Sequence, residues 1–149
     1  MRGILDCETD ILPLLKRHVV ILVDDDLSTL RSLERLLVHE PYEIRTTFRP
    51  EQALAWVSAR DISLVLADHH MPDMSGTEML SGVRQIAPGT TCVMLTAFKD
   101  RLFLSDEVKA WVREVIEKPW DNRHLKKTIR NLLRERELKE DHRRPEGHN

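Results

Sequence analysis

The sequence is poor in several features that mark particular classes of protein. Its two cysteines, Cys7 and Cys92, stand far apart in 149 residues and form neither a C-x-x-C pair nor a metal-binding spacing, so no disulfide framework is indicated. No apolar run approaches the roughly 20 residues that cross a bilayer. The N-terminus lacks the basic region and the continuous apolar segment of a signal peptide. These absences predict a cytoplasmic protein with reduced thiols and no membrane contact.

A strong charge of either sign is also missing. The formal net charge is −2 with histidines neutral, which gives no general attraction to nucleic acid. Hydrophobic residues make up 41% and charged residues 32% of the chain, a balance that is ordinary for a folded domain. There are no internal repeats and no low-complexity linker. A chain of this length is most simply one domain with its own core.

What the sequence does contain is a regular alternation of two hydrophobic patterns. Short apolar runs predict strands, and apolar residues at helical spacing predict the helices between them. The predicted strands are 19–23, 42–46, 62–68, 91–96 and 112–117, and the predicted helices begin near residues 28, 50, 77, 99 and 121. Strands that alternate with helices through short connections predict an α/β fold with a doubly wound, five-stranded parallel sheet.

The same pattern suggests how the chain is divided. Residues 1–18 carry scattered apolar residues without a sustained period and are expected to form an N-terminal arm. Residues 19–134 hold the whole strand and helix pattern. Residues 135–149 are almost wholly charged and are expected to be a solvated extension of the last helix, or a linker toward an output outside this sequence.

Polar side chains follow four of the predicted strands. Right-handed crossovers bring the carboxyl ends of parallel strands to one edge of the sheet, where ligands bind in such folds. Carboxylates suit Mg²⁺, whereas a hydroxyl and an ammonium group can hold the oxygens of a phosphoryl group. This set predicts phosphoryl transfer to a carboxylate. Its members are Asp24, Asp25 and Asp26 after the first strand, Asp68 after the third, Thr96 after the fourth and Lys118 after the fifth.

Each of these residues alone has an ordinary structural explanation. The acidic triplet could cap the first helix, Asp68 could be a turn residue, Thr96 a strand-end hydroxyl and Lys118 a surface lysine. Their joint placement at strand ends favours a functional site. The adjacent pair His69 and His70 is not expected to bind zinc, because neighbouring side chains diverge and no second group of His or Cys completes a site.

Four segments at strand ends resemble a known family. In order along the chain they are I-L-V-D-D-D at 21–26, L-A-D-H-H-M-P-D-M-S-G at 66–76, L-T-A at 95–97 and E-K-P-W at 117–120. Together they resemble the receiver domains of two-component response regulators, over about residues 19–134. The K-P-W-D segment is most similar to receivers fused to signalling outputs. The resemblance implies a flavodoxin-like (βα)5 fold with strand order 2-1-3-4-5.

The resemblance also implies roles at the acidic end of the site. Asp68 would be the phosphoacceptor, which takes a phosphoryl group from a histidine of a sensor kinase. A Mg²⁺ ion would be bound by Asp24, Asp25, Asp68 and the backbone carbonyl of His70. Asp24 and Asp25 are preferred over Asp26 because this choice aligns the apolar positions of the first helix with those of the family.

Further roles follow from the fifth strand and from the family's partners. Thr96 would hydrogen-bond the phosphoryl group, Lys118 would pair with it, and the bond before Pro119 would be cis. Such a protein is a switch that catalyses only its own phosphorylation and dephosphorylation, not an enzyme acting on other substrates. Its partners would be a sensor histidine kinase and a fused or separate output domain. Homodimerisation is left open, and no direct contact with nucleic acid is expected.

Three departures from the family pattern accompany the match. Val115 stands where members often carry an aromatic residue that turns inward on activation, and 109–111 lacks the usual glycine. His70 and Phe98 occupy positions that tune the lifetime of the phosphoryl group, and this bulky pair predicts slow autodephosphorylation.

The sequence is also compatible with two other functions. Val115 and the unusual fourth helix favour an interaction module that works without phosphorylation. Asp24-x-Asp26 superficially matches the nucleophile motif of haloacid-dehalogenase-type phosphatases. That family, however, carries Gly-Thr where this chain has Leu27-Ser28.

Overall fold

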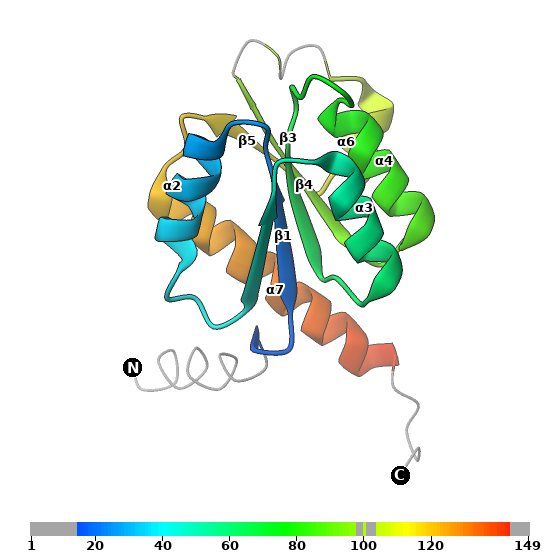
Figure 1. Cartoon of the computed structure of the whole chain (residues 1–149). Helices are drawn as coiled ribbons and strands as arrows, with labels where there is room; N and C mark the ends of the chain where they lie inside the picture. The colour runs from blue at the N-terminus through cyan, green and yellow to red at the C-terminus, as the bar shows by residue number, and fades with distance from the viewer. Residues whose placement is uncertain (1–14, 98–99, 101–103, 144–149) are drawn as a thin grey trace.

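A single parallel sheet forms the centre of the protein. The computed structural model describes residues 15–97, 100 and 104–143. The strands pair in parallel in the order β2-β1-β3-β4-β5, which confirms the predicted fold class and strand order (Figure 1). They are β1 (Val19–Val23), β2 (Glu43–Thr47), β3 (Leu64–Asp68), β4 (Thr91–Ala97) and β5 (Glu114–Lys118).

A helix follows each strand. The helices are α2 (Leu27–Leu37), α3 (Pro50–Ala59), α4 (Gly76–Ile86), α6 (Asp106–Trp111) and α7 (Asn122–Arg143). All of these helices except α6 begin close to the predicted positions. The helix expected over 99–111 is interrupted, because Leu104 and Ser105 are not helical. Ser105 instead caps α6, and its side chain accepts a hydrogen bond from the amide of Val108. Residues 98–99 and 101–103 lie outside the described residues.

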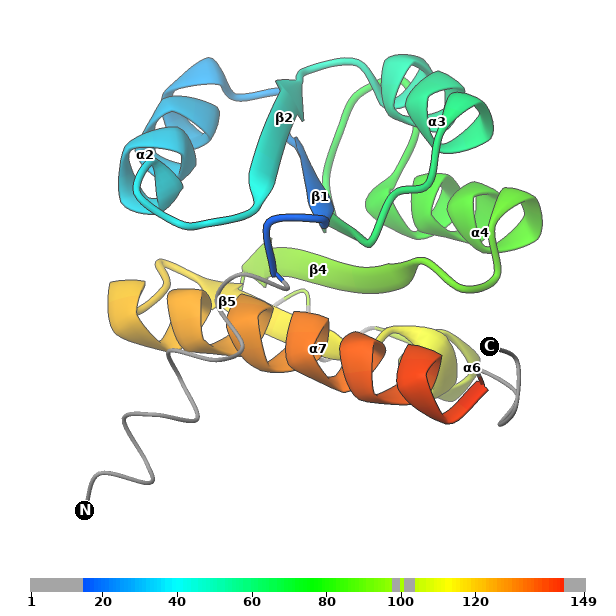
Figure 2. The same cartoon turned by 90° about the horizontal axis from the view of Figure 1, so that it is seen from below.

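Both faces of the sheet are covered, which explains why the strand runs are continuously apolar. On β1, Val20 and Leu22 point into a core cluster shared with α2 and α7. Val19, Ile21 and Val23 point into a second cluster shared with α3 and α4. Figure 2 shows α2 and α7 on one side of the sheet and α3 and α4 on the other. All strand carboxyl ends therefore meet at one edge.

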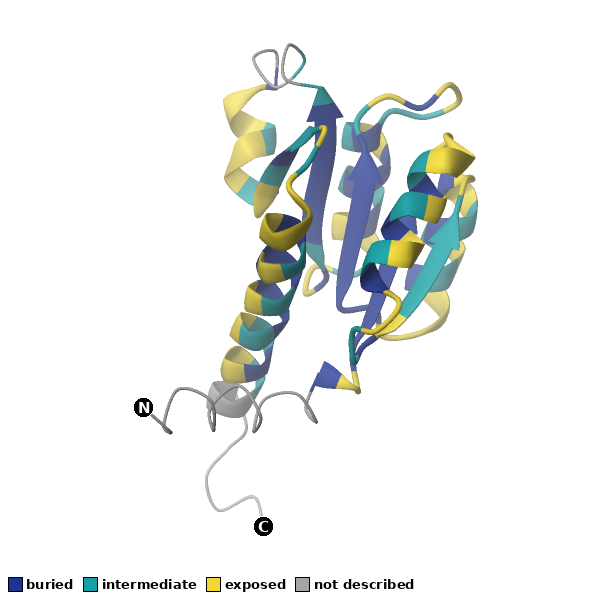
Figure 3. Cartoon of the chain, turned by 90° about the vertical axis from the view of Figure 1, so that its left-hand side faces the viewer, coloured by how far each residue is buried: buried dark blue, intermediate teal, exposed yellow. Residues whose placement is uncertain are grey.

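Helix α7 is held against the domain along its length, including part of the charged extension. Its buried face is visible in Figure 3. Glu137 is only 3% exposed, with Oε2 2.7 Å from Arg17 and Oε1 2.8 Å from Nε2 of the buried His18. Leu15 also lies in the core. The expectation that this extension is simply solvated is therefore wrong at Glu137. None of the described helices combines the length and apolarity needed to cross a membrane.

Candidate functional site

Residues from three strands meet at the carboxyl edge of the sheet, the upper edge in Figure 1. Asp24 directly follows β1, Asp68 ends β3 and Lys118 ends β5. The ammonium group of Lys118 lies 2.9 Å from Asp24 Oδ2 and 2.7 Å from Asp68 Oδ1. The structure therefore brings together three of the residues that the sequence assigned to the site.

The two carboxylates paired with Lys118 are almost completely shielded from solvent. Asp24 is 1% exposed and Asp68 is 7% exposed. Burial raises the pKa of Asp24, and the charge of Asp68 acts in the same direction, while hydrogen bonds from the Asp26 amide and Lys118 oppose it. Burial by itself lowers the pKa of Lys118, but its hydrogen bonds to Asp68 and Asp24 and their charges outweigh that effect, so the net pKa is raised.

The acidic triplet divides into two functions. Asp26 is the N-cap of α2 and accepts hydrogen bonds from the amide and the hydroxyl of Ser28, at 2.9 and 2.8 Å. Asp24 and the exposed Asp25 instead group with Asp68, with one carboxylate oxygen from each lying within 4.8 Å of the others. Three carboxylates at this spacing fit Mg²⁺, which prefers oxygen ligands.

Thr96 lies near the carboxyl end of β4, the strand paired with β3, and its hydroxyl contacts His69. It is buried in β4, and its Oγ1 lies 3.2 Å from Nδ1 of His69. No hydrogen bond joins it to Asp68 or Lys118 among the described residues. Burial lowers the pKa of His69 and the neighbouring His70 adds to this, against the opposing charges of Asp100 and Asp68. The sequence reasoning missed this contact, since two polar residues 27 positions apart carry no pairing signal.

The two adjacent histidines lie together, so the prediction that their side chains diverge is wrong. Their ring centroids are 4.7 Å apart with 39° between the planes. Nε2 of His70 lies 2.8 Å from Oδ2 of Asp100. β3 ends at Asp68, so the strand alternation that sends neighbouring side chains to opposite faces no longer applies. The metal role of the His70 carbonyl remains a prediction, and Phe98 lies outside the described residues.

Gly76 sets how closely α4 approaches the end of β3. A Cβ atom built at this position would lie 2.3 Å from the backbone oxygen of Asp68 and 2.9 Å from Cα of His69. The Gly76 amide donates to the His69 carbonyl over 2.9 Å. The end of β3 and the loop that follows Asp68 are therefore fixed against the first turn of α4.

The fifth strand ends as the family resemblance implied. The Lys118–Pro119 peptide bond is cis, which confirms that prediction. Val115 packs, partly buried, against the core cluster on the α3 and α4 side of the sheet. No aromatic side chain occupies this position.

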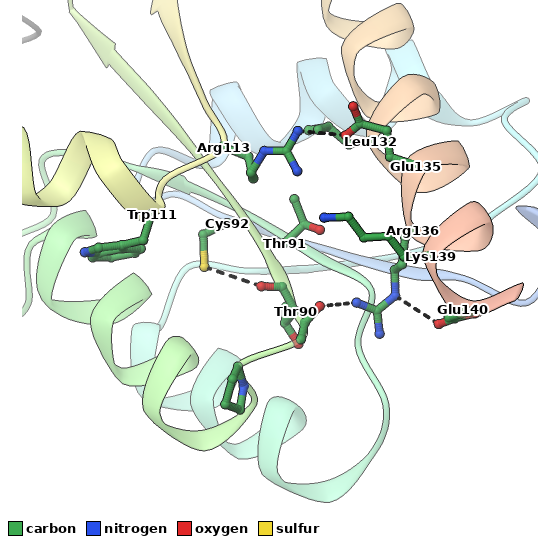
Figure 4. A pocket seen from close by; sticks show the side chains of 12 residues that line it. Thr90, Thr91, Cys92, Trp111, Arg113, Leu132, Glu135, Arg136, Lys139 and Glu140 are labelled. Carbon is green, nitrogen blue, oxygen red and sulfur yellow. Dashed lines mark hydrogen bonds and ion pairs between the residues drawn. The ribbon is translucent and has the colours of Figure 1, made fainter. Parts of the chain in front are cut away.

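A pocket of about 260 Å³ lies at the opposite edge of the sheet, where β4 begins (Figure 4). Arg113 and Glu135 form an ion pair of 2.7 Å in its wall. The side chain of Arg136 contacts the carbonyl of Gly89. These contacts join α7 to the start of β4 and are remote from the carboxylates that end the strands.

Comparisons with known proteins agree with the geometry. Residues 20–130 match the response regulator receiver domain family. Over 131 residues the chain is 29% identical to the hydrogenase transcriptional regulatory protein HoxA of Cupriavidus necator, a match that covers 85% of this chain and 26% of that protein. The chain thus spans about a quarter of the length of the regulators it matches first.

Solved structures have the same fold, and one of them is a receiver domain protein. A CheY-like response regulator receiver domain protein from Methanospirillum hungatei is 30% identical, with a TM-score of 0.72 over 82% of this chain and 98% of that one. An uncharacterized protein from Neptuniibacter caesariensis is 29% identical, with a TM-score of 0.80 over 88% of this chain and 98% of that one. The chain therefore belongs to the response regulator receiver domain family, whose members serve as phosphoacceptor switches in two-component signalling.

Proposed function

We propose that Asp68 accepts a phosphoryl group from the phosphohistidine of a sensor histidine kinase in the cytoplasm. The observation that carries this assignment is the Lys118 ammonium group, which pairs with the buried Asp24 and Asp68 at the carboxyl edge of the sheet. A Mg²⁺ ion would be held by Asp24, Asp25, Asp68 and the His70 carbonyl. When bound, it supplies positive charge to the phosphoryl oxygens.

The proposed step is a displacement at phosphorus. A carboxylate oxygen of Asp68 forms the new P–O bond while the P–N bond to the kinase imidazole breaks and its electron pair returns to the ring. Lys118 lies 2.7 Å from an Asp68 oxygen, where its charge can stabilise the added oxygens. Thr96 would exchange its contact with His69 for one with the phosphoryl group.

The modification would then act on the rest of the domain through charge. A phosphoryl group adds roughly −1.5 to −2 of charge, and movement of Thr96 and Lys118 toward it would shift the surface formed by α6 and β5 between two states. The kinase, a fused or separate output domain and a homodimer are the partners that this surface and the family resemblance suggest.

One observation favours a switch that does not use the inward turn of an aromatic side chain on β5. Val115 packs against the core from β5, and a branched aliphatic side chain cannot make the large inward rotation of an aromatic ring. The alternative of a phosphatase finds no such support, because Asp26, the second carboxylate of its motif, is used as the cap of α2.

The test is covalent labelling with acetyl phosphate in the presence of Mg²⁺. Intact-mass measurement is expected to show an adduct of about 80 Da, the mass of the charge-bearing group, and EDTA is expected to abolish it. Asp68→Asn should not be labelled, whereas Asp73→Asn, which removes an exposed carboxylate from the loop that follows Asp68, should be labelled normally. Equal labelling of Asp68→Asn and the wild type would refute the assignment.

A further inference from the structure

A second group of metal-binding side chains lies next to the acidic site. His69 and His70 follow Asp68 in the β3–α4 loop, and Asp100 lies in the connection between β4 and α6. One ligand atom from each of these three residues lies within 4.8 Å of the others. The group therefore joins two loops at the carboxyl edge of the sheet.

We propose that His69, His70 and Asp100 form a binding site for one divalent transition-metal ion, with Zn²⁺ as the representative ion. Two imidazoles and one carboxylate are a ligand set that Zn²⁺ uses where it keeps a fourth position for water or another ligand. This site and the neighbouring carboxylates are expected to prefer different metals. Imidazole nitrogen favours zinc, copper and nickel, whereas oxygen ligands suit Mg²⁺.

The spacing of the three groups fits such an ion after small side-chain movements. Ligand atoms about 2.0–2.2 Å from a tetrahedral metal lie roughly 3.4 Å from each other. The His70–Asp100 pair at 2.8 Å is slightly closer than this, and no two of the three ligand atoms lie more than 4.8 Å apart. His70 has a side chain that is 71% exposed, so it can turn to meet an incoming ion.

The orientation of His69 is already set by a neighbour. Its Nδ1 lies 3.2 Å from the hydroxyl of Thr96, which leaves Nε2 as the nitrogen for a metal. Metal-bound histidines characteristically use their second nitrogen in such a contact, which fixes the ring and its tautomer. The side chain of Asp100 is 18% exposed and is positioned before any ion binds. An ion here would tie Asp100, in the β4–α6 connection, to the loop that follows Asp68.

This inference does not depend on phosphorylation of Asp68 and is tested by binding alone. The full chain is titrated with Zn²⁺ by calorimetry in excess Mg²⁺, which occupies the carboxylate site, and with Co²⁺ while its visible absorption is recorded. One equivalent of each ion is expected to bind, with a Co²⁺ spectrum typical of nitrogen ligands. Asp100→Asn removes a direct ligand and is expected to weaken Zn²⁺ binding by at least about 10- to 100-fold, the loss typical of mutating a group that only supports a ligand.

Matched variants separate this site from others on the chain. Asp73→Asn removes an exposed carboxylate from the same loop and should leave Zn²⁺ affinity unchanged. Asp25→Asn disrupts the acidic site and should also retain Zn²⁺ binding. The proposal is overturned if Asp100→Asn binds Zn²⁺ as the wild type does, or if Asp25→Asn alone abolishes binding. Thermal melting shows whether each variant is folded, and His70→Gln offers a second loss-of-ligand variant if Asp100→Asn is not.

Discussion

At the scale of single residues, the acidic site stores an electrostatic cost. Asp24 is 1% exposed, and its pKa is raised above the usual value chiefly by burial. The folded state therefore holds a proton on Asp24 more tightly than the unfolded state does, and ionised Asp24 destabilises the fold. Lys118 offsets only part of this cost. A bound cation would stabilise the ionised carboxylate and so offset the rest of this cost.

The first stability prediction concerns Asp24→Asn, which removes the charge but keeps the shape. At pH 7, without divalent ions, this variant is expected to unfold at higher urea concentration, with a gain on the order of 1 kcal/mol. The difference should shrink as the pH falls through the raised pKa of the folded state and level off below about 3.9, where the wild-type carboxyl is protonated in both states. Asp25→Asn, at an exposed position, is the control and should change stability little. A wild type more stable than Asp24→Asn at every pH would contradict the raised pKa.

The sequence anticipated much of this site because strand ends in a parallel sheet share one edge. The sequence alone is enough to place Asp24, Asp68 and Lys118 there. The contact of His69 with Thr96 and the approach of Asp100 to His70 could not. Both depend on side-chain directions in loops, where neither the strand nor the helix repeat applies.

At the scale of secondary structure, the junction between β3 and α4 depends on Gly76, which has no side chain. Gly76→Ala would place a Cβ atom 2.3 Å from the Asp68 carbonyl oxygen, and backbone atoms cannot yield as a flexible side chain would. We expect a loss of about 1–3 kcal/mol in the free energy of unfolding, measured by urea denaturation. Gly89→Ala is the control, because its nearest neighbour is the Arg136 side chain at 3.9 Å. Equal stability of the two variants would show that α4 can move away freely.

The elements themselves were largely predictable, and the exceptions have physical causes. Continuous apolar runs identified β1 and β4 almost to the residue, because strands covered on both faces have no polar alternation to blur their limits. The apolar pattern placed Ile62 in the third strand, and Ile62 is indeed buried, yet the strand begins at Leu64. Burial and strand pairing need not end at the same residue. Ser105 interrupts the predicted helix before α6. Its side chain accepts a hydrogen bond from the Val108 amide, and such a bond from side chain to backbone competes with continuation of a helix.

At the scale of the whole molecule, the upstream residues and the far part of α7 are joined at the edge opposite the acidic site. Nδ1 of His18 lies 2.6 Å from the hydroxyl of Ser63, and its Nε2 lies 2.8 Å from Glu137. Burial lowers the pKa of His18, against the opposing effect of Glu137. The sequence could not show this arrangement, since a charged stretch gives no sign of which single residue turns inward.

A pH prediction follows from the lowered pKa of His18. The folded state favours the neutral ring, so this contribution to stability is complete above the unfolded pKa of about 6.5 and is lost as the pH falls below it. His18→Gln is expected to reduce the loss of stability between pH 7 and 5 by about 1 kcal/mol, measured by urea denaturation at each pH. His124→Gln, at an exposed position, should retain the wild-type loss. Identical pH profiles for wild type and His18→Gln would exclude His18 as the group responsible.

The contact between His18 and Glu137 also couples movement of α7 to the residues before β1. Glu137 belongs to the same continuous helix as Asn122, which lies four positions after Lys118. If α7 rotates about its own axis, Glu137 moves with it. Arg17 and His18 are then displaced, because both contact Glu137. Such coupling is reciprocal. A partner that binds the residues before β1 would therefore also favour one rotational position of α7.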